Sequence, residues 1–142
     1  MPGFELDSQL ESDSIAVAES ELCLLRLLND ARYAWLLLIP KRQGICEVFE
    51  LDEAEQLQLA RETSAAAAAI KQSFACDKIN VAAIGNIVRQ LHIHVVARNQ
   101  GDPAWPGPVW GHSPRMPYSE GGHIAMRSKL RASAIRDWFS FE

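Results

Sequence analysis

Hydrophobic positions along this chain form several short runs and one long amphipathic stretch. The short runs alternate with polar residues or are continuously apolar, which is typical of strands that are buried on one or both faces. The predicted strands are 15–18, 22–28, 34–39, 78–84 and 91–97. Residues 54–74 lack Gly and Pro and are rich in Ala, Gln, Glu and Leu, which favour a helix. Asp52 is its predicted N-cap.

The connections between these elements predict an α+β fold. Turn-forming residues separate consecutive strands, as short connections between antiparallel neighbours do. We therefore predict an antiparallel sheet of about five strands, with one long helix packed on it. Residues 101–117 are rich in proline and predict an irregular arm, and residues 119–139 predict a C-terminal helix with a basic, solvated face.

The predicted strand 91–97 carries the most informative polar residues. Side chains alternate between the two faces of a strand, so one face is apolar and the other polar. The apolar face holds Leu91, Ile93, Val95 and Ala97, and the polar face holds Gln90, His92, His94 and Arg98. Two of the four histidines therefore lie side by side on a rigid element. They are candidates for catalysis or ligand binding, and a half-buried structural role is the alternative.

The segment from Gln90 to Val96 resembles the signature of the histidine triad (HIT) superfamily, in which three histidines alternate with apolar residues. Gln90 stands at the first histidine position. Further segments agree with bacterial HIT proteins that are similar to diadenosine polyphosphate hydrolases: Asn80 and Gly85-Asn86, Asn29 with 35–42, and the tryptophan-proline stretch 102–111. The resemblance covers roughly residues 4–111. It implies a HIT-like domain over 1–111 and a C-terminal extension, 112–142, packed on the same domain.

The resemblance implies a nucleotide hydrolase or transferase that cleaves at the α-phosphate of a nucleoside 5′-phosphate derivative. Dinucleoside polyphosphates and nucleoside phosphoramidates are the implied substrate classes. His92 matches the middle histidine, which forms a nucleotidyl-histidine intermediate that water hydrolyses. His94 matches the third, which donates a hydrogen bond to an oxygen of the reacting group. The resemblance further implies a homodimer, a purine nucleotide or dinucleotide as substrate, and no metal or cofactor.

Two residues depart from the family pattern near the predicted nucleophile. Gln90 can donate and accept a hydrogen bond, but its amide cannot carry a charge as an imidazole can. Ile87 stands where many relatives carry a Ser or Thr hydroxyl close to the leaving group. Both changes predict weakened or redirected activity.

Three amides are implied as substrate-binding residues. Asn29 matches a ribose-contacting Asn or Asp, and an Asx turn in Asn29-Asp30 is the alternative. Asn80 would reach the phosphate or cap a strand end, and Asn86 replaces the usual Gln. Trp105 and Trp110 would close the pocket, cover a dimer interface or pack in the core.

Two other functions remain open. The chain could bind a nucleotide without turnover, which the departures at Gln90 and Ile87 favour. Alternatively, His92 and His94 could bind a metal ion, provided that His112, His123 or Asp102 supplies a further ligand.

Composition narrows the remaining classes. A chain of 142 residues with net charge −4, and no basic run longer than Lys41-Arg42, predicts one domain that does not bind nucleic acid. The longest apolar run, 34–40, is far shorter than the roughly 20 residues of a membrane helix. The acidic N-terminal segment lacks a signal-peptide pattern, and the three cysteines show no C-x-x-C spacing. We therefore expect a cytoplasmic protein with no membrane partner.

Overall fold

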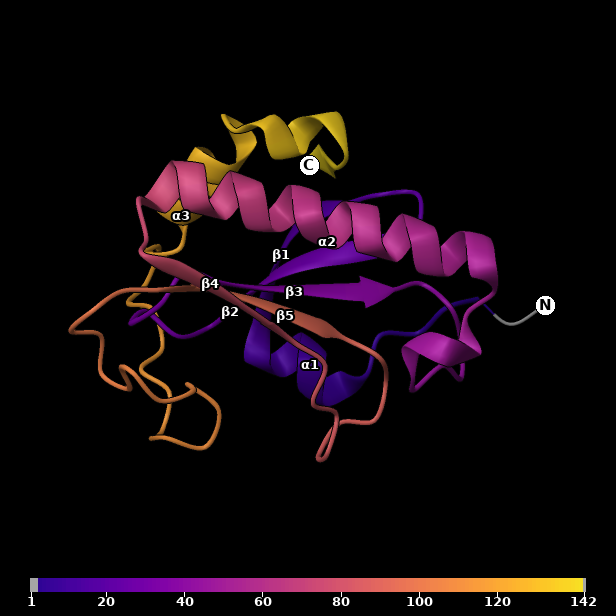
Figure 1. The fold of residues 1–142 in the computed structure, drawn as a ribbon, viewed down its shortest axis with the longest axis horizontal. Helices are drawn as coiled ribbons and strands as arrows, with labels where there is room; N and C mark the ends of the chain where they lie inside the picture. The colour runs from indigo at the N-terminus through magenta and orange to yellow at the C-terminus, as the bar shows by residue number, and fades with distance from the viewer. Residues whose placement is uncertain (1–2, 142) are drawn as a thin grey trace.

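The computed structural model describes residues 3–141, which form one antiparallel sheet with helices on its faces (Figure 1). The sheet order is β4-β5-β3-β2-β1-β6, and every neighbouring pair is antiparallel. The strands are β1 (Ser14–Glu19), β2 (Cys23–Leu28), β3 (Trp35–Pro40), β4 (Lys78–Ala82), β5 (Ile93–Arg98) and β6 (Ser140–Phe141). The α+β prediction is confirmed. The described sheet has six strands rather than about five, because the short β6 pairs with the edge of β1.

The long helix α2 (Glu53–Phe74) covers one face of the sheet (Figure 1). Asp52 caps it, as predicted: its carboxylate accepts from the backbone N–H of Glu55, whose side chain accepts from the Asp52 N–H. Beneath α2 lies the larger hydrophobic core, which includes Leu25, Ile70 and Val95. This burial of α2 and the apolar side of the strands is the main source of the fold's stability.

The opposite face of the sheet is covered by α1 (Ser8–Asp13) and by the irregular arm, residues 99–118. A second hydrophobic cluster fills this side, and it includes Leu10, Trp35, Leu37 and Val96. The central strand β3 is therefore buried along its whole length, as its continuous apolar run predicts. The sequence does not predict α1, because Leu10 is its only buried residue and gives no helical periodicity.

The C-terminal residues pack against α2 on the helix side of the sheet. They form α3 (Ile124–Arg131), the 3₁₀ helix η2 (Ala134–Asp137) and β6, and a further 3₁₀ helix, η1 (Val48–Glu50), precedes α2. Leu130, Ile135 and Phe139 belong to the same core as α2. No helix between residues 3 and 141 has the length and apolar character needed to cross a bilayer.

The strand that carries the histidines begins at Ile93, later than predicted. Leu91 donates its N–H to the carbonyl of Ile45, outside the sheet, so the chain enters β5 only after His92. Antiparallel pairing of β4 with β5 is present, and the connection is a loop over residues 83–92 that contains Gly85-Asn86. This loop and the start of β5 form one wall of the cavity described next.

Candidate active site

His92 and His94 lie in contact on the face of the sheet opposite α2. Their ring centroids are 4.9 Å apart in an edge-to-face arrangement, and only 7% and 8% of the two residues is exposed. The intervening Ile93 turns into the core beneath α2, as do Leu91 and Val95. The predicted alternation of polar and apolar side chains is confirmed, and it brings the two imidazoles together.

The main chain fixes the tautomer of His92. Its Nδ1 lies 2.7 Å from the backbone oxygen of Gln90. A carbonyl oxygen can only accept a hydrogen bond, so Nδ1 carries the proton and Nε2 of the neutral ring keeps its lone pair. His92 therefore presents a nucleophilic nitrogen.

His94 has the opposite tautomer. The indole Nε1 of Trp35 lies 2.9 Å from its Nδ1, and an indole N–H can only donate. The proton of neutral His94 is therefore on Nε2. Burial and the neighbouring His92 lower the pKa of His94 to about 3, so the ring stays neutral at physiological pH. One ring thus offers a lone pair at Nε2, and the other offers an N–H.

The Gln90 side chain points away from both imidazoles, towards the N-terminal segment. Its Oε1 accepts from the Asp7 N–H at 2.8 Å, and its Nε2 donates to the Glu5 oxygen at 2.9 Å. Only the backbone carbonyl of Gln90 contacts His92. The amide thus anchors the segment before α1, and the contact with the nucleophile does not depend on it.

Both imidazoles line a cavity of about 780 Å³. Apolar side chains from α1, β2 and β3 form part of its wall, and charged groups lie at Asp13, Asp30, Arg32 and Arg115. Loop 83–92 contributes Asn86 and Ile87, and the Ile87 side chain is 94% exposed. A cavity of this size with convergent polar groups can hold a nucleotide.

Asn29 and Asn80, two of the amides predicted to bind substrate, lie outside this cavity. The Asn29 side chain accepts from the Tyr118 N–H at 2.9 Å, and that of Asn80 accepts from Arg98 at 2.8 Å. Both amides therefore hold other parts of the chain in place.

The neighbouring Asp30, which the sequence analysis missed, does line the cavity. It is fully buried and forms a two-point ion pair with Arg32, through Nε–Oδ1 at 3.0 Å and Nη2–Oδ2 at 2.9 Å. Arg115, paired with Asp13 at 2.9 Å, was also missed. One signal in the sequence could have pointed to Asp30: the resemblance allows either Asn or Asp at the ribose-contacting position in this turn.

Arg98 holds the arm against the sheet through an ion pair with Asp102. Only 1% of Arg98 is exposed; it binds Asp102 through Nε at 2.8 Å and Nη2 at 3.0 Å, and donates to the Gly107 oxygen at 2.8 Å. The ring of Trp105 packs on the guanidinium at 5.7 Å. The arm in turn places Trp110 in the cavity wall, with its ring centroid 5.4 Å from that of His94.

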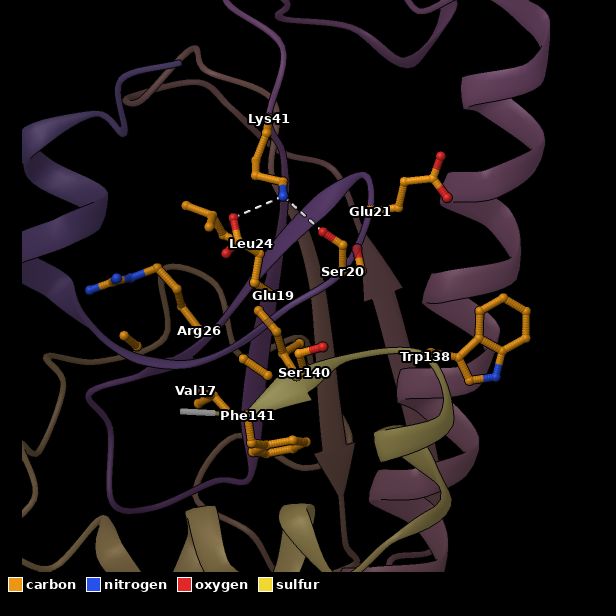
Figure 2. Close-up of a pocket in the computed structure, with 13 residues that line it drawn as sticks. Val17, Glu19, Ser20, Glu21, Leu24, Arg26, Lys41, Trp138, Ser140 and Phe141 are labelled. Atoms are coloured by element: carbon orange, nitrogen blue, oxygen red, sulfur yellow. Dashed lines mark hydrogen bonds and ion pairs between the residues drawn. The ribbon is translucent and has the colours of Figure 1, made fainter. Parts of the chain in front are cut away.

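A separate cavity of about 530 Å³ lies over β1, β2 and β6 (Figure 2). Lys41 Nζ there donates to Glu19 and to the Ser20 oxygen, each at 2.8 Å. Its ammonium group is therefore already satisfied by the protein, and His92 and His94 lie in the other cavity.

Residues 3–141 contain no cluster of three His, Cys, Asp or Glu side chains arranged to hold a metal ion. Asp102 is bound to Arg98, and His112 hydrogen bonds with Ser113 at 2.9 Å. Neither His112 nor His123 lines the histidine cavity.

The lowered pKa of His94 predicts acid destabilisation. The unfolded chain binds a proton near pH 6.5 and the folded chain only near 3, so stability falls as pH drops through this window. Between about pH 7.5 and about pH 5 we expect a loss of about 2 kcal/mol in urea unfolding. Hydrogen bonds from Arg98 hold the pKa of Asp102 below its usual range, so this carboxyl stays ionised between about pH 7.5 and about pH 5. His94→Gln should weaken the dependence; an equal loss in this variant would contradict the assignment.

Comparisons with known proteins agree with the fold. Residues 9–101 match the family model described as the HIT domain. A histidine triad protein from Sinorhizobium meliloti is 47% identical, with a TM-score of 0.89, over 91% of this chain and 96% of that one. Counterparts from Marinobacter aquaeolei and Bradyrhizobium japonicum are 44% and 41% identical, with TM-scores of 0.90 and 0.89. They cover 92% of this chain, and 96% and 98% of their own. A search of curated proteins gave no match. The chain belongs to the histidine triad family.

Proposed function

We propose that this chain cleaves nucleoside 5′-phosphate derivatives at the α-phosphate, with His92 as the nucleophile. The observation that carries this proposal is the pair of opposite tautomers in one cavity. His92 has its lone pair on Nε2, and the adjoining His94 has an N–H there. A nucleophile beside a fixed neutral donor suits phosphoryl transfer, which depends on positioning and on stabilising charge at the phosphate oxygens.

In the proposed reaction, the Nε2 lone pair of His92 forms a bond to the α-phosphorus. The bond from phosphorus to the leaving group breaks, and its electron pair departs with that group. His94 donates its Nε2–H to a non-bridging oxygen. Water then attacks the phosphorus and releases a proton to solvent, the electron pair of the P–N bond returns to Nε2 of His92, and a nucleoside monophosphate is released. The leaving group takes its proton from solvent, since Ile87 has no donor to give.

We assign substrate binding to groups that line the cavity. Asp30 lies in the cavity wall but is fully buried with both oxygens bonded to Arg32, so its proposed role is to hold Arg32 in place. Arg32 and Arg115 are the proposed contacts for phosphate oxygens, and Asn86 is the proposed amide contact near the reacting group. The volume of about 780 Å³ accommodates a purine nucleotide with a substituent.

The test is incubation with diadenosine tetraphosphate and, separately, adenosine 5′-phosphoramidate, in buffer containing EDTA. We expect AMP as a chromatographic product of at least one substrate. A quench in alkali preserves a phosphorus–nitrogen bond, so intact-mass analysis should detect the chain with one added adenylyl group. Lack of AMP and of the adduct with both substrates would refute the proposal for these classes.

Binding without turnover is the second candidate, and one observation favours it. Ile87 extends into solvent at the cavity mouth and places no hydroxyl there. Calorimetric titration with AMP would distinguish the candidates: heat of binding with no product from either substrate would support the binding module.

We also propose that the protein is a cytoplasmic homodimer, as the family resemblance implies. Val81 on the edge strand β4 is half exposed, which leaves apolar surface available for a second copy. All three cysteines are free thiols, which fits a reducing compartment. Light scattering on the purified protein tests the dimer, and a monomer mass would contradict it.

The orientation of Gln90 predicts that its side chain has little effect on turnover. Gln90→Ala should keep the rate of AMP release within about threefold, because the carbonyl that orients His92 remains. Gln90→His should not raise the rate, since its side chain points towards Glu5 and Asp7. A gain of about tenfold in Gln90→His would show that the side chain at this position reaches the substrate.

A further inference from the structure

The indole of Trp35 is a fixed part of the histidine site. Trp35 begins β3 and pairs with Val96 of β5, which places it diagonally across the sheet from His94. Only 6% of the residue is exposed. Tyr33 and Trp110 each pack edge-on against its ring, with centroids 5.9 Å away. The indole is therefore held between neighbours while its N–H points at Nδ1 of His94.

Two tryptophans touch the His94 ring, but only Trp35 bonds to it. The ring centroids of Trp35 and Trp110 lie 5.7 and 5.4 Å from that of His94. The Nε1 of Trp35 donates to Nδ1 at 2.9 Å, whereas the buried Nε1 of Trp110 makes no hydrogen bond within the described residues. Similar packing with and without a hydrogen bond gives a matched pair for comparison.

We propose that Trp35 is a positioning residue that fixes His94 as the neutral Nε2–H tautomer, so that His94 remains a hydrogen-bond donor of constant charge across the working pH range. Protonation of Nδ1 would bring its new N–H against the indole N–H and break the bond. The tautomer follows from the geometry alone. Its role in turnover rests on the function proposed above.

The surroundings of His94 support a ring of constant charge. From β3 it meets the indole of Trp35, and from the arm the indole of Trp110, neither of which titrates. His92 adjoins it on its own segment. The other charged groups of the cavity are Asp13 with Arg115 and Asp30 with Arg32, and each pair is already neutralised. We therefore expect no ionisation of His94 in the pH–rate profile of the wild type.

Nitrogen NMR of the histidine side chains, in protein without ligand, tests the tautomer directly. In the wild type we expect Nδ1 of His94 unprotonated and Nε2 protonated, with no change between about pH 8 and about pH 5. In Trp35→Phe we expect mixed tautomers and a higher pKa of His94, because the donor that opposes protonation of Nδ1 is gone while burial and His92 remain. Trp110→Phe should keep the wild-type tautomer. A fixed tautomer in Trp35→Phe, or the same change in Trp110→Phe, would overturn the proposal.

Two further measurements keep the inference testable. If Trp35→Phe does not fold, the wild type should show a scalar coupling between Trp35 Nε1 and His94 Nδ1 across the hydrogen bond. Its absence would refute the bond. In kinetics, Trp35→Phe should add the ionisation of His94 to the pH dependence of kcat. If the tautomer changes but the pH dependence of kcat does not, the role in turnover is refuted. If the wild type shows no turnover at all, the proposed function fails, and the NMR result on the tautomer still stands.

Discussion

Replacing His92 by alanine should lower the rate of AMP release by at least about a thousandfold, the largest effect on activity that we expect from any single change. The ring whose Nε2 lone pair would attack phosphorus is removed, and the N–H of His94 cannot substitute for it because that nitrogen is protonated. Steady-state assays with the better of the two substrates would measure the loss, and the adenylyl adduct should disappear with it.

His123→Ala is the matched control for this change. His123 lies at the N-terminal end of α3, outside the histidine cavity, so the variant should keep most of the wild-type rate. A His92→Ala protein that still releases AMP at more than about a tenth of the wild-type rate would exclude His92 as the nucleophile.

Replacing Arg98 by methionine should lower the free energy of unfolding by about 3–5 kcal/mol, the largest effect on stability that we expect. The change would leave the Asp102 carboxylate, whose side chain is only 7% exposed, without its partner. The Asn80 side chain and the Gly107 carbonyl would lose their donors as well. Urea unfolding followed by tryptophan fluorescence would measure the loss.

Arg115→Met provides the comparison, since the chain offers a second Arg–Asp pair in a different setting. Arg115 and Asp13 have side chains 40% and 25% exposed, so breaking this pair should cost less than about 1 kcal/mol. The double change Arg98→Met with Asp102→Leu should be less harmful than Arg98→Met alone, because no buried charge is left unpaired. Equal losses in Arg98→Met and Arg115→Met would show that burial does not strengthen the first pair.

The sheet and its histidine face could be predicted because their signals are local. Alternation over residues 91–97 places His92 and His94 on one face whatever the strand pairs with, and the long helix follows from composition and its cap. The short elements α1 and β6 lack such a signal. Leu10 alone marks the first, and the second is only Ser140–Phe141, held by its pairing with β1.

The chemical states of the two imidazoles could not be predicted, because they depend on contacts that the sequence does not reveal. Trp35 and His94 are 59 positions apart, and only the pairing of β3 with β5 brings the indole to the imidazole. The presence of Asp30 rather than Asn29 in the cavity wall could not be predicted for a similar reason. Consecutive residues of a turn point in different directions, and the bond from Tyr118 to Asn29 depends on where the distant arm returns.

The carbonyl of Gln90 has a consequence for how such proteins evolve. Every amino acid has a main-chain carbonyl, so mutation at this position leaves the orientation of His92 unchanged. The side chain can therefore make other contacts. Here the Gln90 side chain tethers the N-terminal segment, while its carbonyl bonds to His92. A family definition that requires all three histidines would then exclude members that orient the middle histidine in the same way. Replacement of the first histidine therefore need not indicate a loss of activity. It can instead indicate a side chain that stabilises another part of the fold.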